Sequence, residues 1–322
     1  MNIYEEIKIA SQRLAPYIYD TPLLYSHPLS RMSGGAVYLK LESEQYTGSF
    51  KARGALNKIL ALSPMARKMG VVAASTGNHA RGLARALSIT STSGLIFVPE
   101  NIDPAKRQAL EYFKVPIETH GKNGLETEIY ARQYAAENGK IYVSPYNDPH
   151  VIAGQGTIAA EITKHLFKVD DVLACMGGGG LMSGIGIWMQ NWMPDARLTG
   201  CLPKNSPEFF LSMKKGEIVT LDEHQPTLSD GSAGGMEKGS VTFEICRQFV
   251  RDFAIVSEKQ IAHAIRYMLE THHKLIEGAA GVALAGFLKD PERYKGRKVV
   301  IIICGGNIAY DTLQQALAMT EL

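Results

Sequence analysis

The sequence predicts an α/β protein with mostly parallel strands, and three observations lead to this fold class. Short runs rich in β-branched residues alternate with helical stretches through the first half of the chain. The second half repeats this alternation. At 322 residues, with 45% hydrophobic and 20% charged residues, the chain can bury a large core over one or two domains. Because successive parallel strands are joined by crossover helices, we expect helices that cover the faces of the sheet.

Predicted strands are the apolar runs bounded by turn residues, and predicted helices are the longer periodic stretches between them. The strands of the first half are GVVAAS (70–75), SGLIFVPE (93–100), VPIETHG (115–121) and IYVSPY (141–146). The helices between them run from about His79 to Leu87, over 103–113 with Asp103 as N-cap, and over 125–139. The second half continues with a helix at 154–167, a strand at 170–176, a loop and helix at 177–189, strands at 196–202 and 252–257, a helix at 257–273 and a last core strand at 298–306.

Composition excludes several classes of protein. The net charge of +2, without a dense basic run, argues against nucleic-acid partners and anionic membranes. Four widely spaced cysteines without a C-x-x-C pair fit a reducing cytosol, and the acidic start MNIYEEIKIA is not a secretory signal. The uncharged stretch from Val172 to Pro194 holds six glycines, so we interpret it as a strand, a glycine loop and a packed helix. We therefore expect a cytoplasmic protein without a membrane span.

The glycine loop in that stretch, Met176–Gly180 (MGGGG), is a candidate phosphate site. Consecutive glycines present several N–H groups to one anion, and the dipole of the following helix adds positive charge. The loop does not match the dinucleotide fingerprint G-x-G-x-x-G, because Met182 and Ser183 occupy the positions where its last glycine would fall. The ATP-binding P-loop signature is also absent. The alternative is a tight strand–helix turn without a ligand.

A second candidate is Lys51 in the segment GSFKARGA (48–55). If Ser49 caps a helix, Lys51 lies in its first turn, where the positive end of the helix dipole lowers the pKa of the amine. A neutral lysine amine condenses with carbonyl groups. Taken alone, the segment fits a solvated surface lysine equally well.

Two further motifs follow predicted strands, namely STGNH (75–79) and CGGN (304–307). The carboxyl ends of strands are where open α/β sheets bind ligands. With the tetraglycine loop, these motifs resemble the fold-type II pyridoxal phosphate enzymes, in the branch of threonine/serine dehydratases and serine racemase. The resemblance covers nearly the whole chain in the order SFKARGA, STGNH, SPYNDPHVIAGQGTIAAEI, GGGGLMSG, IEGAAGVALA, CGGN.

The resemblance implies a fold, an organisation and an activity. The fold is tryptophan synthase β-like, with two open, twisted, mostly parallel sheets and flanking helices. Residues 1–60 and 141–322 would form a large cofactor-binding domain, and 61–140 a small inserted domain. The implied activity is β-elimination of a 3-hydroxy amino acid, L-threonine and/or L-serine, to a 2-keto acid and ammonia. Relatives are often dimers or tetramers, so we expect a homo-oligomer.

The resemblance also assigns roles to single residues. Lys51 holds pyridoxal 5'-phosphate as a Schiff base and moves the Cα proton, and Thr76 keeps a hydroxyl where serine racemase has its second catalytic residue. Residues implied to contact the cofactor are Phe50, Lys51, Asn78, Gly177, Gly178, Gly179, Gly180, Leu181, Glu277 and Cys304. Residues implied to contact the substrate are Ser75, Thr76, Asn78, His79 and Tyr146.

Cys304 is implied to face the pyridine nitrogen of the cofactor. A thiol has an ordinary pKa near ~8.5, and burial raises it, so Cys304 would be neutral there. A neutral partner makes the ring a weaker electron sink than a carboxylate would, which favours prompt loss of a β leaving group. The alternative is a small core residue on a buried strand.

The chain departs from its relatives at three places. Some relatives have a cation-binding carboxylate where this chain has Leu202, so we expect no metal there, although Glu208 could give one oxygen. Thr127 stands where serine racemase has an arginine, which disfavours racemase-like handling of a dicarboxylate. After CGGN we find no counterpart of the regulatory domain of biosynthetic threonine deaminases, so we expect no feedback control through one.

Several functions stay open at this point. Within the fold they are a serine racemase and a dehydratase for phenylserine, 3-hydroxyaspartate or a hydroxyectoine-derived substrate. A β-replacement synthase is disfavoured because SFKARGA differs from the S-x-K-D-R pattern of cysteine synthases. A non-catalytic anion-binding protein is the alternative from another class. The polar, glycine-rich segment from Thr220 to Lys238 is long enough to predict a functional loop.

Overall fold

The computed structural model describes residues 1–221 and 225–319, and over these residues the strands form two separate sheets. The larger sheet has six strands in the order β1-β2-β10-β7-β8-β9, and the smaller has four in the order β5-β4-β3-β6. All neighbouring strands are parallel except β1, which pairs antiparallel with β2 at the edge of the larger sheet. The predicted fold class, α/β with mostly parallel sheets, is confirmed.

The bounds of the elements are as follows. The strands are β1 Leu23–Tyr25, β2 Ala36–Leu41, β3 Val71–Ala74, β4 Gly94–Val98, β5 Ile117–Thr119, β6 Ile141–Tyr142, β7 Asp171–Cys175, β8 Arg197–Pro203, β9 Val250–Val256 and β10 Lys298–Ile303. The helices are α1 Ile3–Leu14, α2 His27–Ser33, α3 Lys51–Ala61, α4 Pro64–Met69, α5 Asn78–Thr90, α6 Pro104–Glu111, α7 Gly124–Glu137, α8 Pro149–His165, α9 Gly180–Trp192, α10 Glu208–Lys215, α11 Val241–Phe249, α12 Glu258–His272, α13 Gly278–Leu288 and α14 Tyr310–Ala318.

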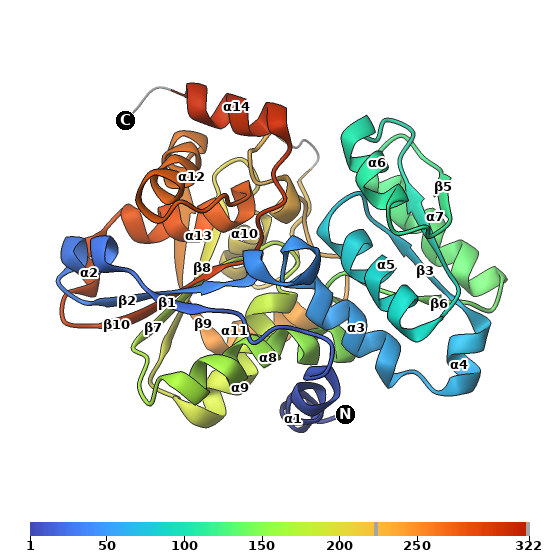
Figure 1. Ribbon diagram of the computed structural model, residues 1–322, viewed down its shortest axis with the longest axis horizontal. Coiled ribbons are helices and arrows are strands. Elements are labelled where there is room, and N and C mark those ends of the chain that lie inside the picture. The colour runs from blue at the N-terminus through green and yellow to red at the C-terminus, as the bar shows by residue number, and fades with distance from the viewer. Residues whose placement is uncertain (222–224, 320–322) are drawn as a thin grey trace.

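Helices cover both faces of the larger sheet. Helices α12 and α13 lie on one face, and α8 and α9 lie on the other (Figure 1). The central strand β10 is buried on both sides, and Val299 through Ile303 have no exposed surface. A continuous apolar run, rather than an alternating one, is what a parallel strand between two helical layers requires.

The smaller sheet shows the alternation expected of a strand with a different layer on each face. Val72, Leu95 and Phe97 pack against α7, whereas Ile96 and Val98 pack against α5 and α6. This sheet lies beside the larger one, with α3 and α8 between the two (Figure 1). Its strands span 71–142, and β6 begins one residue past the predicted limit of the small domain. The division into domains stays a prediction.

The stretch from Val172 to Pro194 forms strand β7, the glycine loop and helix α9, as interpreted from the sequence. Within the described part of the chain, no helix combines the length and apolar character needed to cross a bilayer. All four cysteines are buried and none is in a disulfide. In the segment from Thr220 to Lys238, residues 222–224 lie outside the described residues, and Asp230–Ser232 form a 3₁₀ turn.

Candidate active site

The candidate residues come together where strands of both sheets end. The glycine loop follows β7, Cys304 to Asn307 follow β10, and Ser75 to Asn78 follow β3. The Asn78 side chain lies within hydrogen-bond distance of Glu277 and Asn307, so the end of β3 in the smaller sheet faces the end of β10 in the larger one. This is the position at which open parallel sheets bind ligands.

Lys51 is the first residue of α3, in the predicted first turn of a helix. Its Nζ donates to the carbonyl oxygen of Pro145 at 2.7 Å, and Lys51 forms no ion pair with any described residue. Burial lowers the pKa of this amine to about 8, against the opposing electrostatic influence of Cys304 and Glu277. The lowered pKa was predicted, but burial rather than the helix dipole is the main cause.

The prediction that Ser49 caps this helix was wrong. Phe50 stands at the N-cap position, and no side chain caps the helix. Ser49 is extended, with φ −163° and ψ 161°, because it pairs with Gly305 in an antiparallel bridge. Its buried Oγ has no hydrogen-bond partner among the described residues. The bridge ties the start of α3 to the loop after β10, which brings Lys51 close to Cys304.

The glycine loop packs so tightly that side chains have no room. A Cβ at Gly178 would lie 2.4 Å from the Tyr146 ring, and one at Gly177 would lie 2.8 Å from the carbonyl oxygen of Ser232. Gly179 has φ +81°, a conformation that side chains disfavour. Helix α9 begins at Gly180, so its first N–H groups, Leu181 included, are free of intrahelical bonds and can bind an anion.

We predict that Gly178→Val weakens cofactor binding about tenfold or more, because the added side chain forces Tyr146 and the loop apart. The measurement is a titration of apoprotein with pyridoxal phosphate, followed by absorbance. Gly124→Ala is the matched control, since a Cβ at Gly124 meets nothing within 4 Å. Equal affinity in Gly178→Val and the control would contradict the assignment of the loop.

Asn78 and Glu277 lie at the centre of a hydrogen-bond network. Asn78 Nδ2 donates to both carboxylate oxygens of Glu277, at 2.8 and 2.9 Å, and its Oδ1 accepts from Asn307 Nδ2 at 2.7 Å. Burial raises the pKa of Glu277 to about 7, against the bond from Asn78. Arg81, one turn further along α5, donates to Asn307 Oδ1 at 2.8 Å and was not singled out in the sequence.

Cys304 and Phe50 lie next to Lys51. The Phe50 N–H donates to the Cys304 carbonyl oxygen at 3.0 Å, and Lys51 Nζ lies 5.2 Å from the centre of the Phe50 ring. Burial, then the negative charge of Glu277, raises the pKa of the Cys304 thiol well above its ordinary value. Cys304 is therefore a neutral group at neutral pH.

The predicted substrate residues divide into two groups. Ser75, Thr76 and Asn78 surround the start of α5, where the first N–H groups of the helix can bind a carboxylate. The His79 ring points elsewhere: its Nε2 lies 3.0 Å from the carbonyl oxygen of Val143, and burial lowers its pKa to about 3. His79 is therefore neutral and can meet an anion through its backbone N–H. Tyr146 packs on the glycine loop instead of on α5.

The sequence did not identify the residues of the segment 225–242 that line this site. The Ser232 carbonyl lies against Gly177, and Thr242 Oγ1 at the start of α11 donates to the Gly178 carbonyl oxygen at 2.7 Å. Length and polarity predicted a functional loop from Thr220 to Lys238, which includes Ser232 but not Thr242, and no local pattern marks which residue reaches the glycine loop.

The position predicted to lack a metal ligand, Leu202, is buried on β8. Glu208 accepts a hydrogen bond from Ser206 Oγ at 2.6 Å. Among the described residues, no three His, Cys, Asp or Glu side chains are grouped so as to hold a metal ion.

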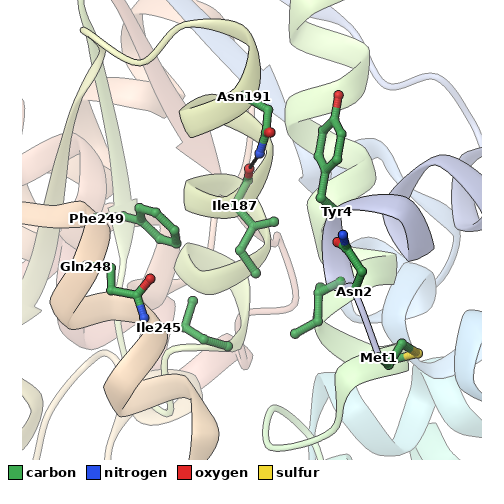
Figure 2. Close-up of a pocket in the computed structure, with 9 residues that line it drawn as sticks. Met1, Asn2, Tyr4, Ile187, Asn191, Ile245, Gln248 and Phe249 are labelled. Carbon is green, nitrogen blue, oxygen red and sulfur yellow. Dashed lines mark hydrogen bonds between the residues drawn. The ribbon is translucent and has the colours of Figure 1, made fainter.

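A cavity of about 390 Å³ lies between α1, α9 and α11 (Figure 2). Its lining comprises Met1, Asn2, Ile3, Tyr4, Ile187, Asn191, Ile245, Gln248 and Phe249. These side chains are apolar or neutral, and α9 contributes its C-terminal half, at the far end from the glycine loop. We therefore place the chemistry at the strand ends and not in this cavity.

A buried lysine amine of lowered pKa and a glycine cradle for phosphate, brought together at the strand ends of an α/β fold, define an enzyme that uses a phosphorylated carbonyl cofactor. The family model described as pyridoxal-phosphate dependent enzyme matches residues 14–305. The chain belongs to that family.

Known proteins of this family resemble the chain over nearly its whole length. The chain is 39% identical to the L-threonine ammonia-lyase of Thermotoga maritima over 97% of this chain and 77% of that protein. It is 36% identical to the catabolic L-threonine dehydratase of Escherichia coli K12, over 98% of this chain and 96% of that protein. The structure of maize serine racemase superposes with a TM-score of 0.91 at 29% identity, covering 98% of this chain and 96% of that one.

The residues present fit pyridoxal phosphate. Lys51 offers an amine of lowered pKa to an aldehyde, and the loop 177–180 leaves backbone N–H groups, not side chains, facing a phosphate. The buried hydroxyl of Ser49, two residues before Lys51 and opposite Gly305, has no hydrogen-bond partner among the described residues. A buried polar atom without a protein partner is often one reserved for a ligand or water.

The lowered pKa of Lys51 gives a pH prediction. Only the neutral amine attacks an aldehyde, so covalent attachment of pyridoxal phosphate to the apoprotein should speed up with rising pH and level off above about pH 8. An ordinary lysine would continue to speed up toward its usual pKa of 10.5. Stopped-flow absorbance between pH 6 and 10 measures the profile, at roughly tenfold per pH unit below the pKa. A profile still rising at pH 10 would show that burial does not act on Lys51 as described.

Proposed function

We propose that the protein eliminates the 3-hydroxyl of L-threonine and/or L-serine and releases a 2-keto acid and ammonia. The observation that carries this proposal is the pairing of the Lys51 amine with the neutral thiol of Cys304 in one site. The names of the bacterial relatives, an ammonia-lyase and a dehydratase acting on L-threonine, support the same reaction. The reaction balances without a further reactant, because the water molecule lost from the substrate is added back when the enamine product hydrolyses to the keto acid and ammonia.

The residues would act as follows. Pyridoxal phosphate, when bound, supplies an aldehyde that condenses with amines and a ring that spreads negative charge away from the substrate Cα. Lys51 Nζ takes the Cα proton. The first N–H groups of α5 hold the substrate carboxylate, and the loop 177–180 holds the phosphate. Asn78, which bonds to Glu277 and Asn307, would also hydrogen-bond the ring hydroxyl of the cofactor.

Elimination is favoured over transamination by the neutral character of Cys304. A carboxylate beside the ring nitrogen would hold it protonated and would stabilise charge at Cα for longer. A neutral thiol of raised pKa stabilises the negative charge at Cα less. The β leaving group therefore departs before another atom takes up a proton, as transamination would require. The resemblance at Thr76, which keeps a hydroxyl where serine racemase has its second catalytic residue, favours a second candidate, serine racemisation.

The substrate is proposed to carry a neutral side chain. Next to Tyr146, whose Oη accepts from the Glu237 N–H, the two carboxylates of Glu237 and Glu128 both pair with the one guanidinium of Arg132. This excess of negative charge beside Tyr146 disfavours a second carboxylate on the substrate. We therefore place 3-hydroxyaspartate below L-threonine and L-serine.

Keto-acid release from purified holoprotein tests the function, across L-threonine, L-serine, phenylserine, a hydroxyectoine-derived amino acid and 3-hydroxyaspartate. We expect kcat/KM to be highest for L-threonine or L-serine and at least about tenfold lower for 3-hydroxyaspartate. Chiral chromatography of recovered serine reads out the racemase alternative. Absence of turnover with all five substrates would sink the proposal, and a holoprotein that takes up no cofactor would favour a binding role.

We also propose that the protein acts in the cytoplasm as a homo-oligomer, a dimer or a tetramer. Four free, buried cysteines support a reducing compartment. Light scattering measured at several protein concentrations tests the oligomeric state.

A further inference from the structure

The segment 225–242 joins the glycine loop to the helices of the smaller sheet. On one side, Ser232 and Thr242 contact Gly177 and Gly178. On the other side, Asp230 pairs with Lys106 of α6 at 2.5 Å, and Glu237 pairs with Arg132 of α7 at 2.5 Å. The segment therefore transmits the position of α6 and α7 to the wall of the site.

Glu237 is where the contacts of this segment meet. One carboxylate oxygen, Oε2, pairs with Arg132, and the backbone N–H donates to Tyr146 Oη at 2.8 Å. The other carboxylate oxygen, Oε1, is buried without a hydrogen-bond partner among the described residues. The pair is partly exposed, with 37% of the Arg132 side chain and 24% of the Glu237 side chain accessible to solvent, so Arg132 offsets in part the desolvation of the Glu237 carboxylate.

Arg132 is held in place before it reaches Glu237. Its guanidinium lies 4.2 Å from the centre of the Tyr142 ring and donates to Glu128, one turn earlier on α7, at 2.8 Å. A planar guanidinium stacked on an aromatic ring and fixed by a carboxylate loses little further freedom when it pairs with a second carboxylate. The pair is therefore preorganised from the side of α7.

Tyr146 carries the effect into the site. Its ring occupies the space in front of Gly178, and its Cα and Cβ lie against Gly180. The residue before it, Pro145, accepts the hydrogen bond from Lys51. The residue after it, Asn147, accepts from the Val241 N–H at 2.9 Å. Movement of Glu237 would move the hydroxyl of Tyr146, and with it the ring that supports the phosphate cradle.

We propose that Arg132 and Glu237 are positioning residues: the ion pair between them holds the Tyr146 ring against the glycine loop and so sets how tightly the site binds cofactor and substrate. This inference rests on the proposed function of the site. Neither side chain touches the glycine loop, so their effect passes through Tyr146. The two residues are 105 positions apart in the sequence, and through Arg132 helix α7 would influence binding at the glycine loop.

The test uses Arg132→Gln, Glu237→Gln and the double variant, compared as apoprotein titrated with pyridoxal phosphate and as holoenzyme acting on L-threonine. We expect each single variant to raise both the dissociation constant of the cofactor and the KM for L-threonine about tenfold, because one charged hydrogen bond is lost. We expect kcat to fall less than about threefold. The double variant should resemble the singles, because both substitutions break the same interaction. Arg132→Lys, which keeps the charge, should recover part of the affinity.

Arg107→Gln is the matched control, since Arg107 pairs with Glu111 on the exposed face of α6 at 3.2 Å. The inference is overturned if the singles bind cofactor and substrate as the control does, or if the double variant shows the product of the two single effects. Urea unfolding checks that each variant is folded, and Arg132→Lys keeps the test valid should Arg132→Gln unfold. The cofactor titration needs no turnover, so a wild type that binds cofactor but transforms no substrate would refute the proposed function and leave the pair testable.

Discussion

Lys51→Ala is expected to abolish turnover and to remove the borohydride-reducible attachment of the cofactor. The substitution takes away the amine that binds the aldehyde and the base that moves the Cα proton. Loss of a general base alone costs about 10²–10⁴ in rate, and loss of covalent attachment adds to it. We therefore expect kcat/KM for L-threonine to fall by at least about 10³-fold.

This variant should remain folded, because Lys51 bonds to Pro145 O and forms no ion pair with a described residue, and because its burial disfavours the charged amine. Circular dichroism and urea unfolding check the fold. Lys68→Ala on α4 is the control, as Lys68 lies on an exposed turn away from the site. Activity of Lys51→Ala within tenfold of the wild type would mean that another group is the base.

Arg53→Met is expected to cause the largest loss of stability. Arg53 has no exposed surface and holds two carboxylates at once, Glu42 at 2.7 Å and Glu161 at 2.6 Å. Removing one partner of a buried ionic network leaves uncompensated charge and costs about 3–5 kcal/mol. Arg53 lies two residues after Lys51, and its ion pair with Glu161 anchors the first turn of α3 to α8. Part of the cofactor affinity should therefore be lost as well.

Urea unfolding of the apoprotein at pH 7 measures this effect. Burial alone would raise the pKa of Glu42, but Arg53, together with Lys40, lowers it overall. The stability that this carboxylate contributes is therefore fully present above its ordinary pKa of 4.5, declines below that value, and is lost as the pH falls through its lowered pKa in the folded protein. Arg53→Met should thus differ most from the wild type near neutral pH and less near pH 3. A loss of less than about 1 kcal/mol in the free energy of unfolding at pH 7 would contradict this prediction, because it would mean that the Arg53 network contributes no more than an exposed ion pair does.

The sequence predicted elements whose causes are local. Asp103 caps α6, accepting from the N–H groups of Ala105 and Lys106, because an N-cap needs only its own next three residues. The strands at 70–75 and 93–100 were found because their apolar runs end at turn residues. Helix α13 (Gly278–Leu288) was not found, since it is buried almost all round and so lacks an amphipathic period.

Features that depend on distant contacts were missed or explained by the wrong cause. Ser49 looks like an N-cap, but its bridge to Gly305, far along the chain, keeps it out of that role. The low pKa of Lys51 comes from burial under other segments, which no local pattern contains. The partnership of Arg132 with Glu237 likewise exists only after the two sheets have come together.

The central claim is that the Lys51 amine holds an aldehyde whose phosphate rests on the backbone of residues 177–180. Borohydride reduction of the holoprotein, followed by proteolysis and mass spectrometry, tests it most directly. The account predicts one pyridoxyl phosphate adduct, on the peptide that contains Lys51. An adduct on a different lysine, or none after saturation with pyridoxal phosphate, would contradict it.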